Sequence, residues 1–165
     1  MSLPPWAIVT PERRAHIERV ASLLDAWAAR LAVDGTERAR WLRAAHLHDA
    51  LRDAPLATKL AHGPAAADRA AREGETDRGV LDAVRYHTVG YAGWDDVGRM
   101  LYLADFLEPG RAVGPDERRA LAERVPVERD AILIEVVRRR IEWTLRSRWP
   151  LAPETVDFWN TLVSR

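Results

Sequence analysis

The sequence predicts an all-α protein, built as a single bundle of irregularly packed helices. Apolar residues recur at three- and four-residue steps along most of the 165 residues, which is the period of an amphipathic helix. No stretch shows the two-residue alternation of a strand, and no repeat or low-complexity linker is present. Apolar residues make up 47% of the chain and charged residues 30%, as in a folded globular domain.

Caps and helix breakers predict where the helices lie. Thr10 followed by Pro11 predicts the start of a helix that runs to about Val33. Gly35-Thr36 breaks this helix, and Thr36 caps a second one that reaches about Arg52. Further helices are predicted after Thr76, after Asp95 or Asp96, from Pro115, from about Pro126 to Trp149, and from Pro153 to the C-terminus.

The length of the chain suits one domain with one core. We expect residues 1–165 to form a single unit, with a core of about 10–111 and helices of about 114–165 packed on it. The apolar, tryptophan-bearing C-terminal helices can pack either internally or against a second copy of the chain. The sequence therefore leaves open whether the protein forms a homodimer.

Charge and composition exclude several classes of partner. The 25 basic and 25 acidic residues cancel, so no global field favours nucleic acid or a membrane. The absence of cysteine excludes disulfides, thiolate metal sites and cysteine nucleophiles. The first residues do not resemble a signal peptide, and no apolar run approaches the ~20 residues of a membrane span. We expect a cytoplasmic protein.

The stretch RAAHLHDALRD, residues 43–53, holds the first candidate metal ligands. On a helix His48 and Asp49 point ~100° apart, so both can reach one cation, whereas His46 points ~200° from His48 and should face away. Asp105 interrupts the apolar helix face of MLYLADFLEP, where a carboxylate is costly to bury unless it is paired or bound to a cation. These residues alone leave two alternatives, a metal site or structural polar residues.

The order of these residues along the chain resembles the HD-domain phosphohydrolases. That family has a histidine, a His-Asp pair and a final aspartate, here His16, His48-Asp49 and Asp105. HGP at 62–64 and the stretch VLDAVRYHTVGYAGWDDVGRMLYLADFLEPGR at 80–111 resemble one branch, the YqeK-like hydrolases that split diadenosine tetraphosphate symmetrically. The resemblance extends from about residue 10 to the end of the chain.

The resemblance implies an all-helical HD fold that holds one or two transition-metal ions. Iron is the family's usual metal, and manganese, zinc, nickel or cobalt would suit the same imidazole and carboxylate ligands. One ion would be held by His16, His48, Asp49 and Asp105. Asp49 would bridge to a second ion completed by His62 and His87, and we take Asp49, His62 and His87 as the catalytic residues.

The expected reaction is hydrolysis of dinucleoside polyphosphates, with diadenosine tetraphosphate giving two ADP. We expect Arg52, Lys59, Thr88 and Arg111 to bind the nucleotide or other phosphorylated small molecule. Two departures from the family concern Arg52, which replaces a usual lysine, and the 12-residue segment 50–61, which is shorter than in better-known members. Another nucleotide hydrolase, such as a phosphomonoesterase, and a non-catalytic nucleotide-binding module are the alternatives.

Three residues near these motifs have simpler interpretations. Trp94 could stack on a base, but packing in the core is favoured. Glu108 is expected to cap a helix or pair with an arginine rather than act as a base. Arg19, one turn after His16, is expected to be a salt-bridge partner.

Overall fold

The computed structural model describes residues 2–112 and 114–164. Within these residues the chain forms helices and no strand, which confirms the all-α prediction. None of the described helices combines the length and the hydropathy that a membrane span requires. The elements are α1 (Pro11–Arg30), α2 (Gly35–His48), a 3₁₀ helix η1 (Lys59–Ala61), α3 (His62–Arg72), α4 (Arg78–Tyr86), α5 (Asp96–Leu107), α6 (Pro115–Arg146) and α7 (Pro153–Val163).

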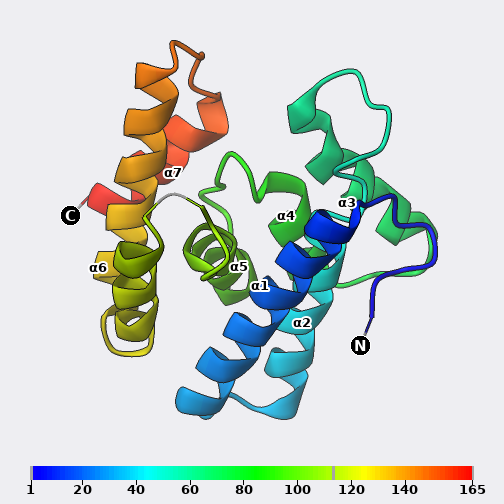
Figure 1. Cartoon of the computed structure of the whole chain (residues 1–165), viewed down its shortest axis with the longest axis horizontal. Helices are drawn as coiled ribbons and strands as arrows, with labels where there is room; N and C mark the ends of the chain where they lie inside the picture. The colour runs from blue at the N-terminus through cyan, green and yellow to red at the C-terminus, as the bar shows by residue number, and fades with distance from the viewer. Residues whose placement is uncertain (1, 113, 165) are drawn as a thin grey trace.

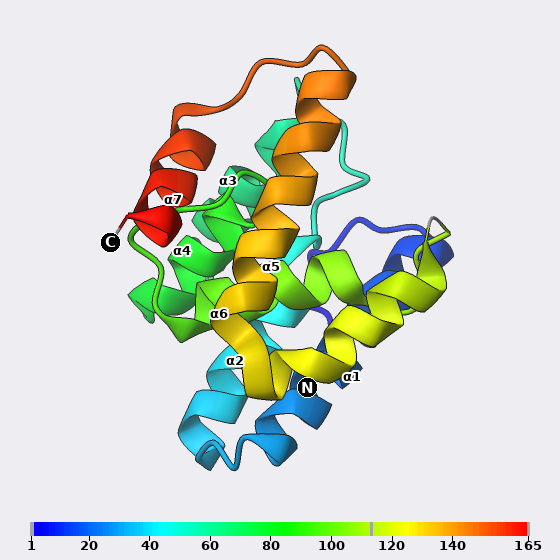
Figure 2. The ribbon, with the colours of Figure 1, turned by 90° about the vertical axis from the view of Figure 1, so that its left-hand side faces the viewer.

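Helix α5 lies at the centre of the bundle (Figures 1 and 2). It contacts α1, α2 and α4 on one side and α6 on the other. Nine of its twelve residues are buried, from Val97 to Leu107, so it is apolar on almost every face. This central position brings its one buried carboxylate, Asp105, among the other helices.

Helix α1 begins as predicted and ends earlier. The Thr10 hydroxyl accepts a hydrogen bond from the Arg13 amide at 3.2 Å, and Pro11 occupies the first turn. The expected end near Val33 is wrong, because Ala32 takes a left-handed conformation with φ of 51°. The amide of Val33 then bonds back to the Ala28 carbonyl, which closes the helix end.

The start and end of α2 both differ from the prediction. Asp34, not Thr36, is its N-cap, because the Asp34 carboxylate accepts from the Glu37 amide at 2.9 Å. The helix stops at His48 rather than Arg52. Nδ1 of His48 lies 2.6 Å from the Ala45 carbonyl, the acceptor that the Asp49 amide would use if the helix continued. Asp49 leaves the helix with φ −107° and ψ 13°.

Aspartates also cap α4 and α5. Asp77 caps α4 by accepting from the Val80 amide at 3.1 Å, so the expectation that Thr76 caps it is wrong. Its carboxylate additionally binds the Arg40 guanidinium, a charge-assisted contact that a threonine hydroxyl could not make. Asp95 caps α5, one of the two predicted positions.

Helix α6 joins two helices that were predicted separately. It runs from Pro115 to Arg146 with a kink at Glu128, whose φ of −127° and ψ of 36° are not helical. Pro126 has no amide hydrogen to give to the Ala122 carbonyl. That carbonyl instead accepts the indole N–H of Trp27 from α1 at 3.0 Å, which ties the kinked helix to the core.

Helix α7 begins at Pro153 as predicted and docks through Phe158. The Phe158 ring lies edge-on to Trp94 and Tyr102, with ring centroids 5.2 and 5.7 Å apart. Trp94 is 5% exposed and donates to the Asp82 carbonyl at 3.0 Å, so the favoured core role is confirmed. Gly90 borders Phe158 with φ of 88°, a conformation that favours glycine.

We predict that Gly90→Ala destabilises the protein by ~2–3 kcal/mol. A Cβ at Gly90 would lie 2.5 Å from Cδ1 of Phe158, so it adds overpacking to the backbone strain of a positive φ. Gly74→Ala is the control, because Gly74 has φ of 103° and no heavy atom within 4 Å of an added Cβ. It should lose only ~1 kcal/mol in denaturant unfolding. Equal losses in the two variants would contradict the packing argument.

Candidate metal centre

Six side chains from five helices or their ends meet in the interior. The ring nitrogens and carboxylate oxygens fall into overlapping groups of three, each within 4.8 Å. All six residues are at most 6% exposed. They come from α1, the end of α2, the start of α3, the end of α4, and α5, and are His16, His48, Asp49, His62, His87 and Asp105.

The two oxygens of Asp49 face different histidine pairs. Oδ1 lies 3.1 Å from Nε2 of His62 and 3.2 Å from Nε2 of His87. Oδ2 lies 3.6 and 3.7 Å from Nε2 of His16 and His48. Asp49 therefore stands between two halves of the cluster, which suits a carboxylate that bridges two cations.

Asp105 completes the half that contains His16 and His48. Its Oδ1 lies 3.0 Å from Nε2 of His16 and 3.8 Å from Nε2 of His48. The opposite half has Nε2 of His62 and Nε2 of His87 3.0 Å apart. Two nitrogens at ~2.1 Å from one ion, with a right angle between them, would be separated by about this distance.

The other nitrogen of each histidine is already engaged. Nδ1 of His48, His62 and His87 faces the carbonyl of the residue three positions earlier, namely Ala45, Lys59 and Val84. Nδ1 of His16 instead faces Oε1 of Glu108 at 3.0 Å. A carbonyl or carboxylate only accepts, so a proton on Nδ1 satisfies each of these contacts and leaves the lone pair of Nε2 for a cation in the cluster.

This arrangement fits a bound cation. Nε2 of His48 is buried without a hydrogen-bond partner, a costly condition for a polar atom. Nε2 of His16 is equally buried, and its 3.0 Å contact with Oδ1 of Asp105 lacks hydrogen-bond geometry. Burial lowers the pKa of His48 to about 4, so its imidazole is neutral near pH 7 and available as a ligand. Four imidazoles and two carboxylates, without thiolates, suit a divalent transition metal.

Three arginines bind the two aspartates from outside. Arg13 donates to Oδ2 of Asp49 at 2.7 Å, Arg111 to Oδ1 of Asp105 at 2.8 Å, and Arg140 to Oδ2 of Asp105 at 3.3 Å. The pKa values of Asp49 and Asp105 lie well below their ordinary range. Burial alone would raise both values, but the histidines around each carboxylate lower them by more. Arg111 and Arg140 lower the pKa of Asp105 further. Both aspartates are therefore ionised in the metal-free protein.

Glu108 and Arg19 form the salt bridge expected from the sequence. Nε of Arg19 donates to Oε2 of Glu108 at 2.6 Å. Burial would raise the pKa of Glu108, but hydrogen bonds from His16, Arg19 and the Gly110 amide lower it to about 2.

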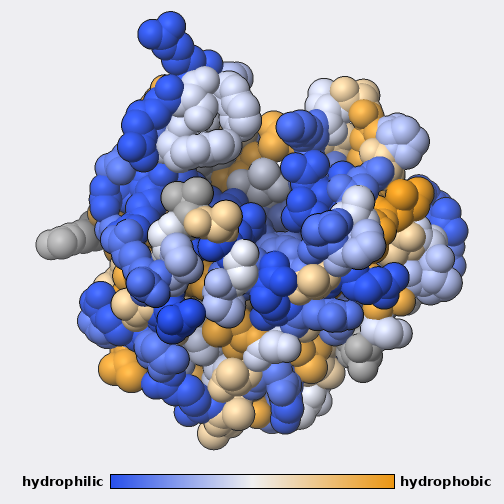
Figure 3. All heavy atoms as spheres, viewed as in Figure 1, coloured by the Kyte–Doolittle hydropathy of each residue, from blue (hydrophilic) through white to orange (hydrophobic). Residues whose placement is uncertain are grey.

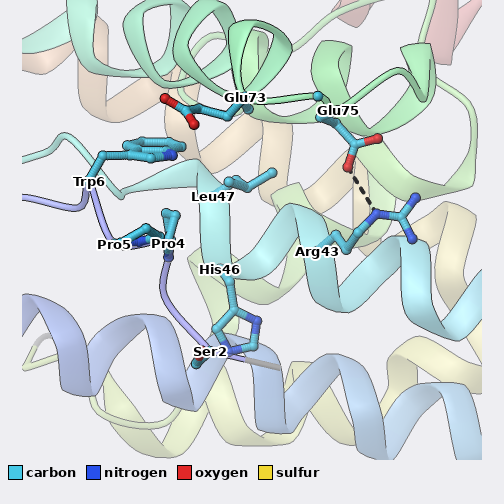
Figure 4. A pocket seen from close by; sticks show the side chains of 11 residues that line it. Ser2, Pro4, Pro5, Trp6, Arg43, His46, Leu47, Glu73 and Glu75 are labelled. Carbon is cyan, nitrogen blue, oxygen red and sulfur yellow. Dashed lines mark hydrogen bonds and ion pairs between the residues drawn. The ribbon is translucent and has the colours of Figure 1, made fainter.

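His46 points away from the cluster, as the helical geometry predicted. It lines a separate pocket of about 390 Å³ with Trp6, Leu47, Glu73 and other residues (Figure 4). Its Nδ1 contacts the Leu42 carbonyl at 2.8 Å. His46 and His48 of RAAHLHDALRD therefore lie on opposite faces of α2.

The four candidate substrate residues take different positions. The Arg111 side chain reaches the cluster through Asp105. Thr88 follows His87, and its carbonyl accepts from Arg140 at 3.2 Å. Arg52 and Lys59 contact residues of the cluster through backbone atoms. The Arg52 amide donates to the Asp49 carbonyl, and the Lys59 carbonyl faces Nδ1 of His62. Lys59 is exposed and Arg52 is half-buried.

Arg13 and Arg140 were missed in the sequence. Arg13 stands one turn before His16 on α1, so helical spacing places both on one face. Arg140 follows Val136 and Val137 by one turn on the apolar face of α6, an unusual position for a charge. An arginine on a buried face is the signal that would have identified it.

Comparison with known folds agrees with this geometry. The structure resembles the crystal structure of an HD superfamily hydrolase from Clostridium acetobutylicum, described as involved in NAD metabolism. The TM-score is 0.80 at 22% identity, over 95% of this chain and 92% of the other. At this identity the likeness concerns the fold.

Similar sequences indicate the family. A symmetrical bis(5′-nucleosyl)-tetraphosphatase from Bacillus subtilis (strain 168) is 37% identical over 108 residues, 64% of this chain and 56% of that relative. The enzyme of the same name from Staphylococcus aureus (strain NCTC 8325 / PS 47) is 29% identical over 105 residues, 62% of this chain and 54% of its own. The match thus spans little more than half the length of these relatives. The HD domain model matches residues 13–133, and the chain belongs to the HD domain family.

Proposed function

We propose that this protein is a metal-dependent phosphohydrolase that splits dinucleoside tetraphosphates symmetrically, so that diadenosine tetraphosphate and water give two ADP. The observation that supports it most directly is the buried cluster of four imidazoles and two carboxylates, with the Nε2 atoms turned inward. The relatives named as symmetrical tetraphosphatases favour this substrate over other phosphate esters.

The proposed cofactor is a pair of transition-metal ions, iron or a similar divalent metal. His16, His48, Asp49 and Asp105 would hold one ion, and Asp49, His62 and His87 the other. Asp49 suits the bridging role because each of its oxygens faces a different histidine pair. When bound, such ions supply acidified water and positive charge for the phosphoryl oxygens.

The arginines around the aspartates are suited to hold the polyphosphate. The side chains of Arg13, Arg111 and Arg140 are 25%, 35% and 20% exposed, whereas Asp49 and Asp105 beneath them are almost closed off. A guanidinium that binds a carboxylate through one edge can offer its other N–H groups to a phosphate. The space-filling view shows an open notch lined by residues of mixed hydropathy, between the C-terminal end of α6 and the segment that leads into η1 (Figures 1 and 3).

Arg52, Lys59 and Thr88 are proposed as further substrate contacts. Arg52 and Lys59 belong to the segment between Asp49 and His62, and most of residues 53–61 are exposed. A phosphate chain extending from the ions over this segment would meet both cations. The same exposure leaves room for mononucleotides, which keeps the phosphomonoesterase alternative open.

Product analysis separates these functions. Reconstituted protein with diadenosine tetraphosphate should yield ADP as the sole nucleotide product. Free phosphate from mononucleotides without ADP formation would favour the phosphomonoesterase. Metal binding without turnover of any of these substrates would favour the non-catalytic module.

Asp105→Asn should remove the metal ion that Asp105 holds and reduce hydrolysis more than ~100-fold, beyond the loss typical of residues that only support ligands. The amide keeps the shape but loses the negative charge that a cation requires. Metal content and ADP formation are measured together with circular dichroism. Asp130→Asn is the control, because Asp130 is exposed on α6. Wild-type metal content in Asp105→Asn would contradict the ligand assignment.

Arg140→Ala should lower kcat/KM for diadenosine tetraphosphate by ~10–100-fold, since a hydrogen bond to a charged group contributes ~1.5–3 kcal/mol. Arg138→Ala is the matched control: Arg138 lies on the same helix but pairs with Glu135 and Glu142 on the exposed face. Metal content is followed in both variants, because Arg140 also contacts Asp105. Equal kcat/KM in the two variants would exclude Arg140 from the substrate site.

A further inference from the structure

His16 differs from the other three histidines in what supports it. Their Nδ1 atoms face backbone carbonyls, which no side-chain substitution removes. Nδ1 of His16 faces the carboxylate of Glu108 at 3.0 Å, from the residue that follows α5. A carboxylate is a stronger acceptor than a carbonyl because it bears a charge. His16 is thus the one cluster histidine whose support is itself a side chain.

Glu108 is held rigidly in this position. It is 1% exposed, and both of its oxygens are occupied. Oε2 accepts from Nε of Arg19 at 2.6 Å and from the Gly110 amide at 2.7 Å, and Oε1 accepts from Nη2 of Arg19 at 3.3 Å. Gly110 permits this approach, since a Cβ there would lie 2.1 Å from Nε of Arg19.

Arg19 and His16 both lie on α1, three positions apart, so they present one face to Glu108. Arg19 balances the negative charge of Glu108, and Glu108 in turn orients the imidazole ring of His16. A purely structural ion pair between α1 and the end of α5 would require only Arg19. The contact between Glu108 and Nδ1 of His16 extends this ion pair to the cluster.

We propose that Glu108 is a positioning residue: it keeps His16 in the Nδ1-protonated form and so sets the metal affinity of the half formed by His16, His48 and Asp105. The half formed by Asp49, His62 and His87 relies on backbone carbonyls and does not depend on Glu108. This inference rests on the metal ligands of the proposed function. Outer hydrogen-bond partners of ligand histidines typically change metal affinity by ~10–100-fold.

The test compares Glu108→Ala and Glu108→Gln with the wild-type chain. Glu18→Gln is the control, because Glu18 is exposed on the same helix as His16. Nitrogen-15 NMR of the metal-free proteins reports which ring nitrogen of His16 bears the proton. Calorimetric titration with Mn²⁺ reports the two classes of site without any substrate.

In Glu108→Ala we expect the proton of His16 to shift toward Nε2, which lies 3.0 Å from Oδ1 of Asp105. One class of Mn²⁺ site should weaken ~10–100-fold, with the other class unchanged. In Glu108→Gln the amide oxygen still accepts from Nδ1, so the tautomer should persist and the affinity loss should be smaller. Glu18→Gln should match the wild type. An unchanged His16 tautomer and unchanged Mn²⁺ affinities in Glu108→Ala would overturn the proposal.

Two features keep the result decisive. If Glu108→Ala does not fold, the isosteric Glu108→Gln decides, because Mn²⁺ affinities equal to the wild type would still contradict the role of the carboxylate. If the wild-type protein binds no Mn²⁺, the ligand assignment of the proposed function fails. The tautomer of His16 in the metal-free variants tests Glu108 independently of that failure.

Discussion

Two ionised carboxylates inside a helical bundle are the condition that the rest of this structure has to meet. Moving an unpaired carboxylate into a protein interior costs several kcal/mol, so positive charge must reach Asp49 and Asp105. It comes from α1 through Arg13, from the turn after α5 through Arg111, and from α6 through Arg140. This requirement ties the distant α6 to the cluster and gives the kinked helix a role beyond packing.

The same interior also determines where helices end. His48 and His87 lie at the C-terminal ends of α2 and α4, each with Nδ1 turned to the carbonyl three positions earlier. One hydrogen bond thus orients the ring and satisfies a carbonyl that the helix end would otherwise leave free. Asp49 departs from the helix directly after His48, which lets its two oxygens face both halves of the cluster. The contacts that end these helices therefore also place the side chains of the cluster.

Periodicity and caps were enough to predict the helical class, the starts of α1, α5 and α7, and the outward direction of His46. The order of histidines and aspartates along the chain pointed to the family, because this pattern can be recognised from the residues themselves without knowing how the chain folds. Helix ends were predicted less well: a histidine side chain competing for the Ala45 carbonyl, or Trp27 filling the carbonyl freed by Pro126, depends on contacts between distant segments. The roles of Arg13 and Arg140 were missed for the same reason, because only the folded chain brings them to the aspartates.

The central claim is that these six side chains hold metal ions with Asp49 between them. Anomalous X-ray diffraction from crystals of the full chain grown with Mn²⁺ tests it most directly. The account predicts one peak beside Nε2 of His16 and His48 and a second beside Nε2 of His62 and His87, with a different oxygen of Asp49 toward each. Anomalous density elsewhere on the protein, with none among these six side chains, would contradict it.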